Sequence, residues 1–305
     1  MAGVTNTVFR RICKELGADV LTSEFVSAEG ILHRNARTRY YVEFEPDERP
    51  IGIQLFGADP GRLAEATRAL IDWVRPDFVD INFGCPVNKV VAKNGGSSLL
   101  RDCPLLSAVA EAVVRAAHPV PATAKIRIGW DSRTINAVET ARALEDAGIS
   151  RIAVHGRTRE QGYSGAACWD TIASVVDAVR VPVVGNGDIR SGADALARAR
   201  QSGVAGLMIG RAAMADPYIF GEIRAALDGR PWRPPTEDER WELIFRHCRE
   251  EIVWRRDERA AMSAMRARLM AYTRGRPGGA RLRERLARVS SLDELRAIAH
   301  ESKNN

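Results

Sequence analysis

The sequence predicts an α/β fold, a TIM (β/α)8 barrel that is followed by a small all-α helical domain. Seven short apolar runs alternate with longer segments of helical periodicity, and this alternation is typical of parallel strands joined by crossover helices. Because a closed barrel of this type needs eight strands, we expect the first strand to be missing or truncated at the N-terminus, with an open sheet as the alternative. The runs lie at residues 19–25, 51–57, 77–84, 122–129, 151–157, 181–188 and 205–211.

The placement of polar residues within the runs favours the barrel. Lys125 and Arg127 share one face of their run, and Asp80 and Asn82 share one face of theirs. Strands of an open sheet covered by helices on both faces should be apolar throughout. Polar side chains on one face near the strand ends are instead typical of a barrel whose rim carries the chemistry.

The segments between and after the runs define the domains. Residues 137–148 and 193–203 have helical periodicity and end in the glycine expected at a helix C-terminus. After Leu227 the pattern changes to a proline-rich stretch, in which Thr236 followed by acidic residues is a helix-start signature. We expect a barrel domain at 1–228, a linker at 229–236 and a helical domain at 237–305.

Composition excludes several classes of protein. With 305 residues, 45% hydrophobic and 28% charged, the chain is typical of a soluble globular protein with room for a barrel. It contains neither an apolar run of membrane-spanning length nor an apolar signal core, so we expect a cytoplasmic location and no membrane contact. Five cysteines without CxxC spacing and five histidines without HxxxH spacing predict reduced thiols and no metal site.

Positive charge is concentrated near the C-terminus. The chain carries a net +6, whereas residues 255–288 alone hold eleven arginines against three acidic residues. A polyanion is the natural partner of such a segment. The alternative is a solvated helical surface without a specific partner.

Polar and glycine-rich groups follow most of the predicted strands, and a barrel would bring them to one rim. The last two groups follow the strands after which such barrels commonly bind phosphate through backbone N–H groups; ordinary βα turns are the alternative. A buried ammonium at Lys125 needs an acceptor or an anion. A flavin fits that need, as does an ion pair with Asp80 or Glu24. The groups are Gln54, 82–85, Lys125, His155, 186–188 and 210–211.

Seven segments, in this order and spacing, resemble the tRNA-dihydrouridine synthases, and most closely the bacterial B-type branch of that family. The resemblance covers nearly the whole chain, and the stretch MRARLMAYTRGRPGGARLR is similar to the family's helical RNA-binding domain. The segments are MAGVTNTVFR, INFGCPVNKV, GGSSLL, KIRIGW, VHGRTREQGYSG, NGDI and LMIGRAAMADPYIF.

The resemblance implies an FMN-containing oxidoreductase that reduces uridine in tRNA to 5,6-dihydrouridine, with NADPH or NADH reducing the flavin. It implies hydride transfer from FMN N5 to C6 of the uracil and a proton from Cys85 to C5. Asn82 matches the residue that contacts the uracil, and we expect Arg127 and Arg157 to bind the substrate as well. The target base must be flipped out of the folded RNA to reach the flavin.

Cofactor and RNA contacts are also implied by the resemblance. The family contacts the flavin at positions that match Met1, Ala2, Gln54, Lys125 and His155, and its phosphate-side contacts match Asn186, Gly187, Asp188, Gly210 and Arg211. RNA contacts are expected at Lys89, Lys93, Arg266, Arg268, Arg274 and Arg276, with tRNA as the partner, rRNA as an alternative target, and a monomeric protein.

The family has a strand before the segment that matches Met1, so we expect a misassigned start codon or a shortened chain rather than a natural seven-stranded enzyme. A small-molecule FMN barrel of the dihydroorotate or dihydropyrimidine dehydrogenase type is the alternative enzyme, and the basic helical segment argues against it. A non-catalytic RNA-binding protein is the alternative outside enzymes.

Overall fold

The computed structural model describes residues 3–34, 36–86, 95–274 and 279–303. Contacts between Cα atoms divide the chain into two compact units. The α/β unit comprises Met1–Thr7 and Asp19–Gly210, and the helical unit comprises Val8–Ala18 and Arg211–Asn305.

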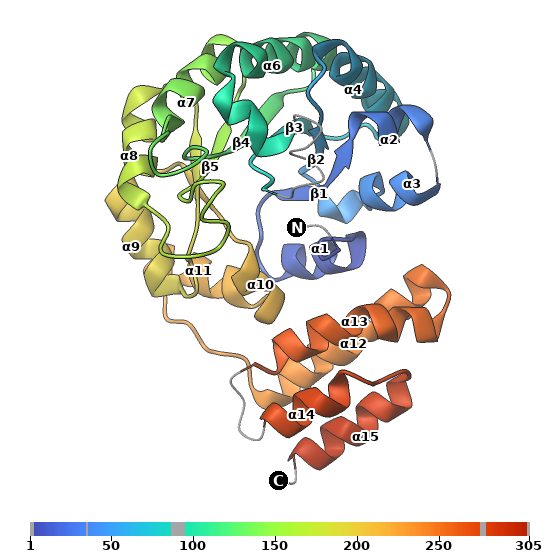
Figure 1. Ribbon diagram of the computed structural model, residues 1–305. Coiled ribbons are helices and arrows are strands. Elements are labelled where there is room, and N and C mark those ends of the chain that lie inside the picture. The colour runs from blue at the N-terminus through green and yellow to red at the C-terminus, as the bar shows by residue number, and fades with distance from the viewer. Residues whose placement is uncertain (1–2, 35, 87–94, 275–278, 304–305) are drawn as a thin grey trace. The chain divides into compact units, whose positions relative to one another are not determined.

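A parallel sheet forms the centre of the α/β unit (Figure 1). Its strands are hydrogen-bonded in the order of the sequence from β1 to β7, and every neighbouring pair is parallel. This confirms the predicted strands and the TIM-like class of the fold; among the described residues, β1 and β7 are the two edges of the sheet. The strands are β1 (Leu21–Ser27), β2 (Ile51–Phe56), β3 (Phe78–Phe83), β4 (Ala122–Arg127), β5 (Ile152–His155), β6 (Val183–Asn186) and β7 (Gly206–Met208).

Helices follow one another around the outside of these strands (Figure 1). Their starts are set by side-chain caps: Asp59 accepts a hydrogen bond from the backbone of Arg62, and Asp102 accepts one from the backbone of Leu105. The predicted glycine end is present at Gly203, which is left-handed with φ of 65°. The outer helices are α4 (Pro60–Val74), α6 (Cys103–Ala117), α7 (Ala137–Asp146), α8 (Trp169–Ala178) and α9 (Gly192–Ser202).

Shorter elements fill the connections of the α/β unit. Two short helices follow β1, a 3-10 turn precedes β2, and a second 3-10 turn precedes α6. The core between strands and outer helices is apolar, and every residue of β3 is buried because both of its faces are covered. These elements are α2 (Ala28–His33), α3 (Ala36–Val42), η1 (Pro46–Glu48) and η2 (Gly96–Arg101).

The helical unit is built on a second apolar core. Thr236 and Glu239 form a capping box that starts its longest helix, as the sequence predicts. Trp241, Met262 and Leu295 are among the side chains buried between the helices. Its helices are α1 (Thr7–Glu15), α10 (Arg211–Ala215), α11 (Ile219–Leu227), α12 (Glu237–Arg255), α13 (Glu258–Tyr272), α14 (Gly279–Leu286) and α15 (Leu292–Lys303).

The division into units differs from the expected boundary after residue 228. Helices α1, α10 and α11 group with the C-terminal helices. The packing of α1 explains its membership: the Phe9 ring stacks on His247 at 5.8 Å between ring centroids, and the Arg268 guanidinium carbon lies 3.7 Å from the Phe9 ring centroid. Arg246 of α12 also pairs with Glu15 at 2.6 Å. The N-terminal helix is therefore part of the helical unit's core.

A membrane span requires a helix of sufficient length and hydropathy. Across the described ranges, no helix is both long and apolar enough to cross a bilayer.

Candidate functional site

The cysteine at the end of β3 is held in a tight turn by the asparagine three residues before it. Asn82 Oδ1 accepts hydrogen bonds from the backbone N–H of Gly84 at 3.0 Å and of Cys85 at 2.8 Å. The Cys85 carbonyl accepts from both the backbone N–H and the hydroxyl of Ser97, at 3.2 and 2.8 Å. Cys85 is 6% exposed and forms no disulfide. The turn thus fixes where the thiol lies.

A chain of buried side chains supports this turn from below. Asn82 Nδ2 donates to Gln54 Oε1 at 2.7 Å, and Gln54 Nε2 donates to Asp80 Oδ2 at 2.6 Å. The Thr123 hydroxyl donates to the other oxygen of Asp80. Gln54, Asp80 and Thr123 occupy one register row across β2, β3 and β4. The predicted parity of the polar face is therefore confirmed.

The direction of the hydrogen bonds in this chain is fixed at both ends. Backbone N–H groups can only donate, so Asn82 must turn its oxygen toward the Cys85 turn and its NH2 toward Gln54. At the other end the carboxylate of Asp80 is an acceptor, so Gln54 must turn its NH2 toward Asp80. Asp80 thereby sets the orientation of both amides.

Burial shifts the pKa values of the two charged groups on this face. Desolvation raises the pKa of Asp80, against the hydrogen bonds from Gln54 and Thr123 that lower it. Desolvation, and then repulsion by Arg127, lowers the pKa of Lys125 to about 8. The Lys125 ammonium makes no hydrogen bond or ion pair with any described residue. The Asp80 carboxylate attracts the ammonium and raises its pKa, so the predicted alternative partner Asp80 acts by electrostatic attraction and not through a hydrogen bond. The N–H groups of Lys125 therefore remain for another acceptor.

The alternative ion pair between Lys125 and Glu24 is wrong, because Glu24 has other partners. Its carboxylate accepts the backbone N–H groups of Gly3, Val4 and Thr5 at 2.7, 2.8 and 2.8 Å. Glu24 is buried within β1 and anchors the segment that follows Met1 and Ala2. This role of Glu24 was not predicted, although an acidic residue inside an apolar run is a signal for it.

Arg127 ties the cysteine turn to the loop after β5. Its Nε donates to the Gly84 carbonyl at 2.9 Å, and its Nη1 donates to the carbonyls of Thr158 at 2.6 Å and Gly162 at 2.9 Å. The side chain is buried. The sequence predicts that Arg127 binds the substrate. In the structure its side chain holds two loops together next to Cys85.

Arg157 has a similar role in the same loop. Its Nη2 donates to Asp188 Oδ2 at 2.8 Å and to the Gly165 carbonyl at 2.6 Å. Asp188, at φ of 49°, also accepts the backbone N–H of Ala167. Arg157 Nη1 is buried without a hydrogen-bond partner among the described residues. The carboxylate of Asp188 is thus occupied by the loop, while one donor of Arg157 stays available.

His155 and Asn186 lie in one row at the carboxyl ends of β5 and β6, next to Arg127 of β4. His155 is buried, and Asn186 Nδ2 donates to the Met208 carbonyl at 2.7 Å. Gly187 follows at φ of 135°, where a Cβ would come within 2.5 Å of Ala167 Cβ. The structure therefore brings together Gln54, Asn82, Cys85, Lys125, Arg127, His155, Arg157, Asn186, Gly187 and Asp188 at one end of the sheet.

Several predicted site residues are not joined to this group. Gly210 ends the α/β unit and Arg211 begins α10 of the helical unit. Met1, Ala2, Lys89, Lys93 and Arg276 lie outside the described residues.

The predicted RNA-binding arginines differ in exposure. Arg266 donates from Nε to the Val289 carbonyl at 2.9 Å, and Arg268 is buried against Phe9. Arg274 is exposed. Two of the three described arginines thus serve the packing of the helical unit.

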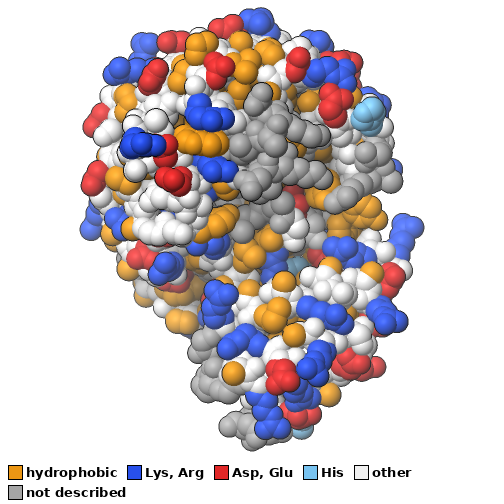
Figure 2. Space-filling view, in the orientation of Figure 1, with side chains coloured by type: hydrophobic (Ala, Val, Ile, Leu, Met, Phe, Trp, Pro, Cys, Tyr) orange, Lys and Arg blue, Asp and Glu red, His pale blue; other side chains and the backbone are white. Residues whose placement is uncertain are grey.

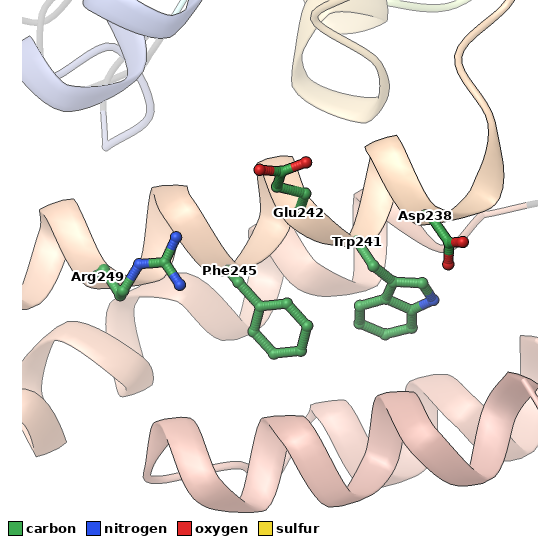
Figure 3. Close-up of a pocket in the computed structure, with 5 residues that line it drawn as sticks. All are labelled: Asp238, Trp241, Glu242, Phe245 and Arg249. Atoms are coloured by element: carbon green, nitrogen blue, oxygen red, sulfur yellow. The ribbon is translucent and has the colours of Figure 1, made fainter.

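A hollow of about 400 Å³ lies on α12 in the helical unit (Figure 3). The Trp241 and Phe245 rings extend on the same side of the helix in Figure 3, and charged side chains flank them. None of its lining residues belongs to the predicted site. The lining residues are Asp238, Trp241, Glu242, Phe245 and Arg249.

The fold and the site define an enzyme of the parallel α/β-barrel class, with a cysteine, a lysine and a histidine at the carboxyl ends of its strands. A family model described as Dihydrouridine synthase matches residues 1–304, and the chain belongs to that family.

Curated relatives cover almost the whole chain. Probable tRNA-dihydrouridine synthase 1 of Synechocystis sp. is 40% identical over 96% of this chain and 82% of its own length. tRNA-dihydrouridine synthase B of Pseudomonas putida is 40% identical over 97% of this chain and 87% of its own length. The B-type protein of Pseudomonas aeruginosa is 38% identical over 100% of this chain and 92% of its own length. The predicted resemblance to the B-type branch is confirmed.

Solved structures support the fold. The crystal structure of TcOYE with pHBA matches with a TM-score of 0.51 and 12% identity, over 76% of this chain and 86% of that chain. Histamine dehydrogenase from Rhizobium sp. 4-9 matches with a TM-score of 0.51 and 16% identity, over 78% of this chain and 45% of that chain. At such identities the likeness concerns the fold alone.

Proposed function

We propose that this chain reduces uridine in tRNA to 5,6-dihydrouridine with FMN as its flavin and Cys85 as the proton donor. Membership of the dihydrouridine synthase family supports the reaction class. The observation that carries the residue assignment is the turn that fixes Cys85 at the rim, held by Asn82 below it and by Arg127 beside it. NADPH is the proposed reductant, and a tRNA substrate implies that the enzyme works in the cytoplasm.

The donors at this rim fit a flavin. The isoalloxazine ring presents carbonyl oxygens and ring nitrogens, and its reduced form carries negative charge near N1. Lys125 offers an ammonium without a partner among the described residues, and Arg157 Nη1 is a buried donor without a hydrogen bond among them. We propose that Gln54, Lys125 and His155 hold the ring. Met1, Ala2, Asn186, Gly187, Asp188, Gly210 and Arg211 are the proposed contacts on the remainder of the cofactor.

Different residues of the chain have different roles in the proposed reaction. When bound and reduced, a flavin supplies the hydride that the C5=C6 double bond of uracil accepts at C6. The Cys85 thiol then gives its proton to C5, which completes the addition of two hydrogens. Asn82 has one amide N–H left after its bond to Gln54, and this group is the proposed uracil contact.

Arg127 acts on this reaction by holding the loop at 158–165 against the cysteine turn, and Arg157 acts by holding the same loop to Asp188. The remaining donor of Arg157 is the proposed point at which this loop meets a ligand. Lys89, Lys93, Arg274 and Arg276 remain the proposed RNA contacts, because Arg266 and Arg268 are engaged within the helical unit.

The exchange Cys85→Ala tests the assignment of the proton donor. We expect the variant to purify with its flavin and to oxidise NADPH, because neither step uses the thiol, while dihydrouridine formation falls by at least about 100-fold, as expected for loss of a general acid. Flavin absorbance, NADPH consumption and nucleoside mass spectrometry of unmodified tRNA measure the three quantities. Cys168→Ala, at an exposed cysteine, is the matched control. Full uridine reduction by Cys85→Ala would remove Cys85 from this role.

A further inference from the structure

Two arginines are stacked on one tryptophan near the rim of the α/β unit. The Arg101 guanidinium carbon lies 4.0 Å from the Trp130 ring centroid, and that of Arg159 lies 4.6 Å from it. Arg101 ends η2, Trp130 follows β4 and Arg159 follows β5. Three segments that are separate in the sequence thus supply one cluster, which we call the Arg-Trp-Arg cluster.

Hydrogen bonds connect this cluster to the cysteine turn. The backbone N–H of Arg159 donates to the Gly129 carbonyl at 2.9 Å, next to Trp130. Arg127 donates to the carbonyl of Thr158, the residue before Arg159, and to the carbonyl of Gly84, the residue before Cys85. The cluster therefore belongs to the same rim as the proposed catalytic group. A ligand that reaches Cys85 with one part can reach the cluster with another.

Arg101 presents a cation that the rest of the described chain does not neutralise. It is exposed and makes no hydrogen bond or ion pair with any described residue. The neighbouring Asp102 accepts the Leu105 backbone N–H at the start of α6, and Asp131 accepts the Arg133 backbone N–H and the Thr134 hydroxyl. Guanidinium remains charged at all ordinary pH values.

Stacking on an indole restricts where such a cation can lie. A guanidinium on an aromatic face keeps its N–H edge open, and that edge matches two oxygens of a phosphate. Ordering the side chain beforehand reduces the entropy lost on binding. Basic and acidic side chains are interspersed on the visible face of the protein (Figure 2), so the distinguishing property of the cluster is this fixed geometry and not a large net charge.

We propose that Arg101, Trp130 and Arg159 form a phosphate-binding platform that holds the backbone of the RNA substrate beside the uridine to be reduced. The proposal rests on the proposed function for the choice of RNA as the ligand. It assigns to the α/β unit an RNA contact in addition to the proposed Lys89 and Lys93, separate from the basic helices. Trp130 orients the two arginines and carries no charge itself.

The salt dependence of tRNA binding tests the platform. Each lost phosphate contact lowers the slope of log K against log salt by about 0.7 to 0.9. We expect Arg101→Gln to reduce the slope by that amount, measured with unmodified tRNA transcript and full-length protein across a salt series. Arg68→Gln is the matched control, because Arg68 is exposed on α4 and has no partner among the described residues; it should leave the slope unchanged.

A second variant separates the platform from a general effect of charge. Trp130→Leu keeps every charge but removes the ring on which both guanidinium groups lie, so we expect tRNA binding to weaken, while flavin content and NADPH oxidation stay at the wild-type level. Equal slopes for Arg101→Gln and Arg68→Gln, or unchanged tRNA binding by a correctly folded Trp130→Leu, would overturn the platform. If the variants behave as expected but the wild type forms no dihydrouridine, the proposed function fails and the platform stands.

Discussion

Two amide side chains near Cys85 have their orientation decided by the groups at the two ends of their hydrogen-bond chain. Gln54 and Asn82 could each rotate by half a turn at little cost in shape. The backbone N–H groups of the cysteine turn prevent this at one end, and the Asp80 carboxylate prevents it at the other. Through Gln54 and Asn82, the buried Asp80 carboxylate therefore sets the geometry of the turn that holds Cys85.

Exchanges at Asp80 separate hydrogen bonding from charge. Asp80→Asn can still accept from Gln54 with its amide oxygen and donate to the Thr123 hydroxyl, so we expect activity close to wild type. Asp80→Leu removes the acceptor and frees the Gln54 amide, and the loss of a buried hydrogen bond of about 1.5 kcal/mol corresponds to roughly a tenfold fall in kcat. Single-turnover rates measure kcat, and the rate of Cys85 alkylation reports the turn independently. An equal loss in both variants would show that charge, not orientation, matters.

Whether a residue's contacts could be predicted from the sequence depended on whether strand geometry or loop geometry determines them. Alternation along β3 and β4 was enough to place Asp80, Asn82 and Lys125 on one face. The partners of Arg127 could not be foreseen, because they are carbonyls of a loop whose path no periodicity describes. The same holds for Glu24, whose partners are backbone N–H groups.

Among the elements, α1 shows how tertiary packing overrides sequence position. It is the first helix of the chain, at Thr7–Glu15. Its membership of the helical unit follows from Phe9, which packs on His247 and Arg268. Helical periodicity in a sequence does not indicate which distant helix the apolar face will pack against.

This packing makes the helical unit sensitive to acid. Burial first, and then Arg268 and Arg246, lower the pKa of His247 well below 6.5, so the folded protein keeps it neutral. The unfolded chain takes up a proton as the pH falls below about 6.5, and the free energy of unfolding should drop by up to about 1.4 kcal/mol per pH unit there. Urea unfolding at pH 7.5 and 5.5 measures the effect.

Two variants test whether His247 causes this pH dependence of the unfolding free energy. His247→Gln should remove most of the decrease, because glutamine does not titrate and can still bond to the Tyr272 hydroxyl, which lies 2.9 Å from His247 Nδ1. His33→Gln, at an exposed histidine, should leave it unchanged. A decrease that survives in His247→Gln would assign the acid sensitivity to other groups.

At the scale of the whole molecule, the sequence predicted the seven parallel strands, their order and the helical C-terminal region. Each strand is a short apolar run that is bounded by glycine or polar residues, so its approximate limits can be located from the local sequence. The grouping of α10 and α11 with the helical unit could not be read from the sequence, because both helices continue the βα pattern of the strands before them. Family membership joins both units to one activity on a folded RNA.

The dihydrouridine content of cellular tRNA is the direct measure of whether this chain reduces uridine in tRNA. Nucleosides from tRNA of a strain that lacks the gene should contain less dihydrouridine than those of the parent, because a uridine position is left unreduced. Position mapping should locate the loss, and the wild-type gene should restore it, whereas the gene carrying Cys85→Ala should not. Unchanged dihydrouridine at every position of tRNA in the deletion strain would contradict the account.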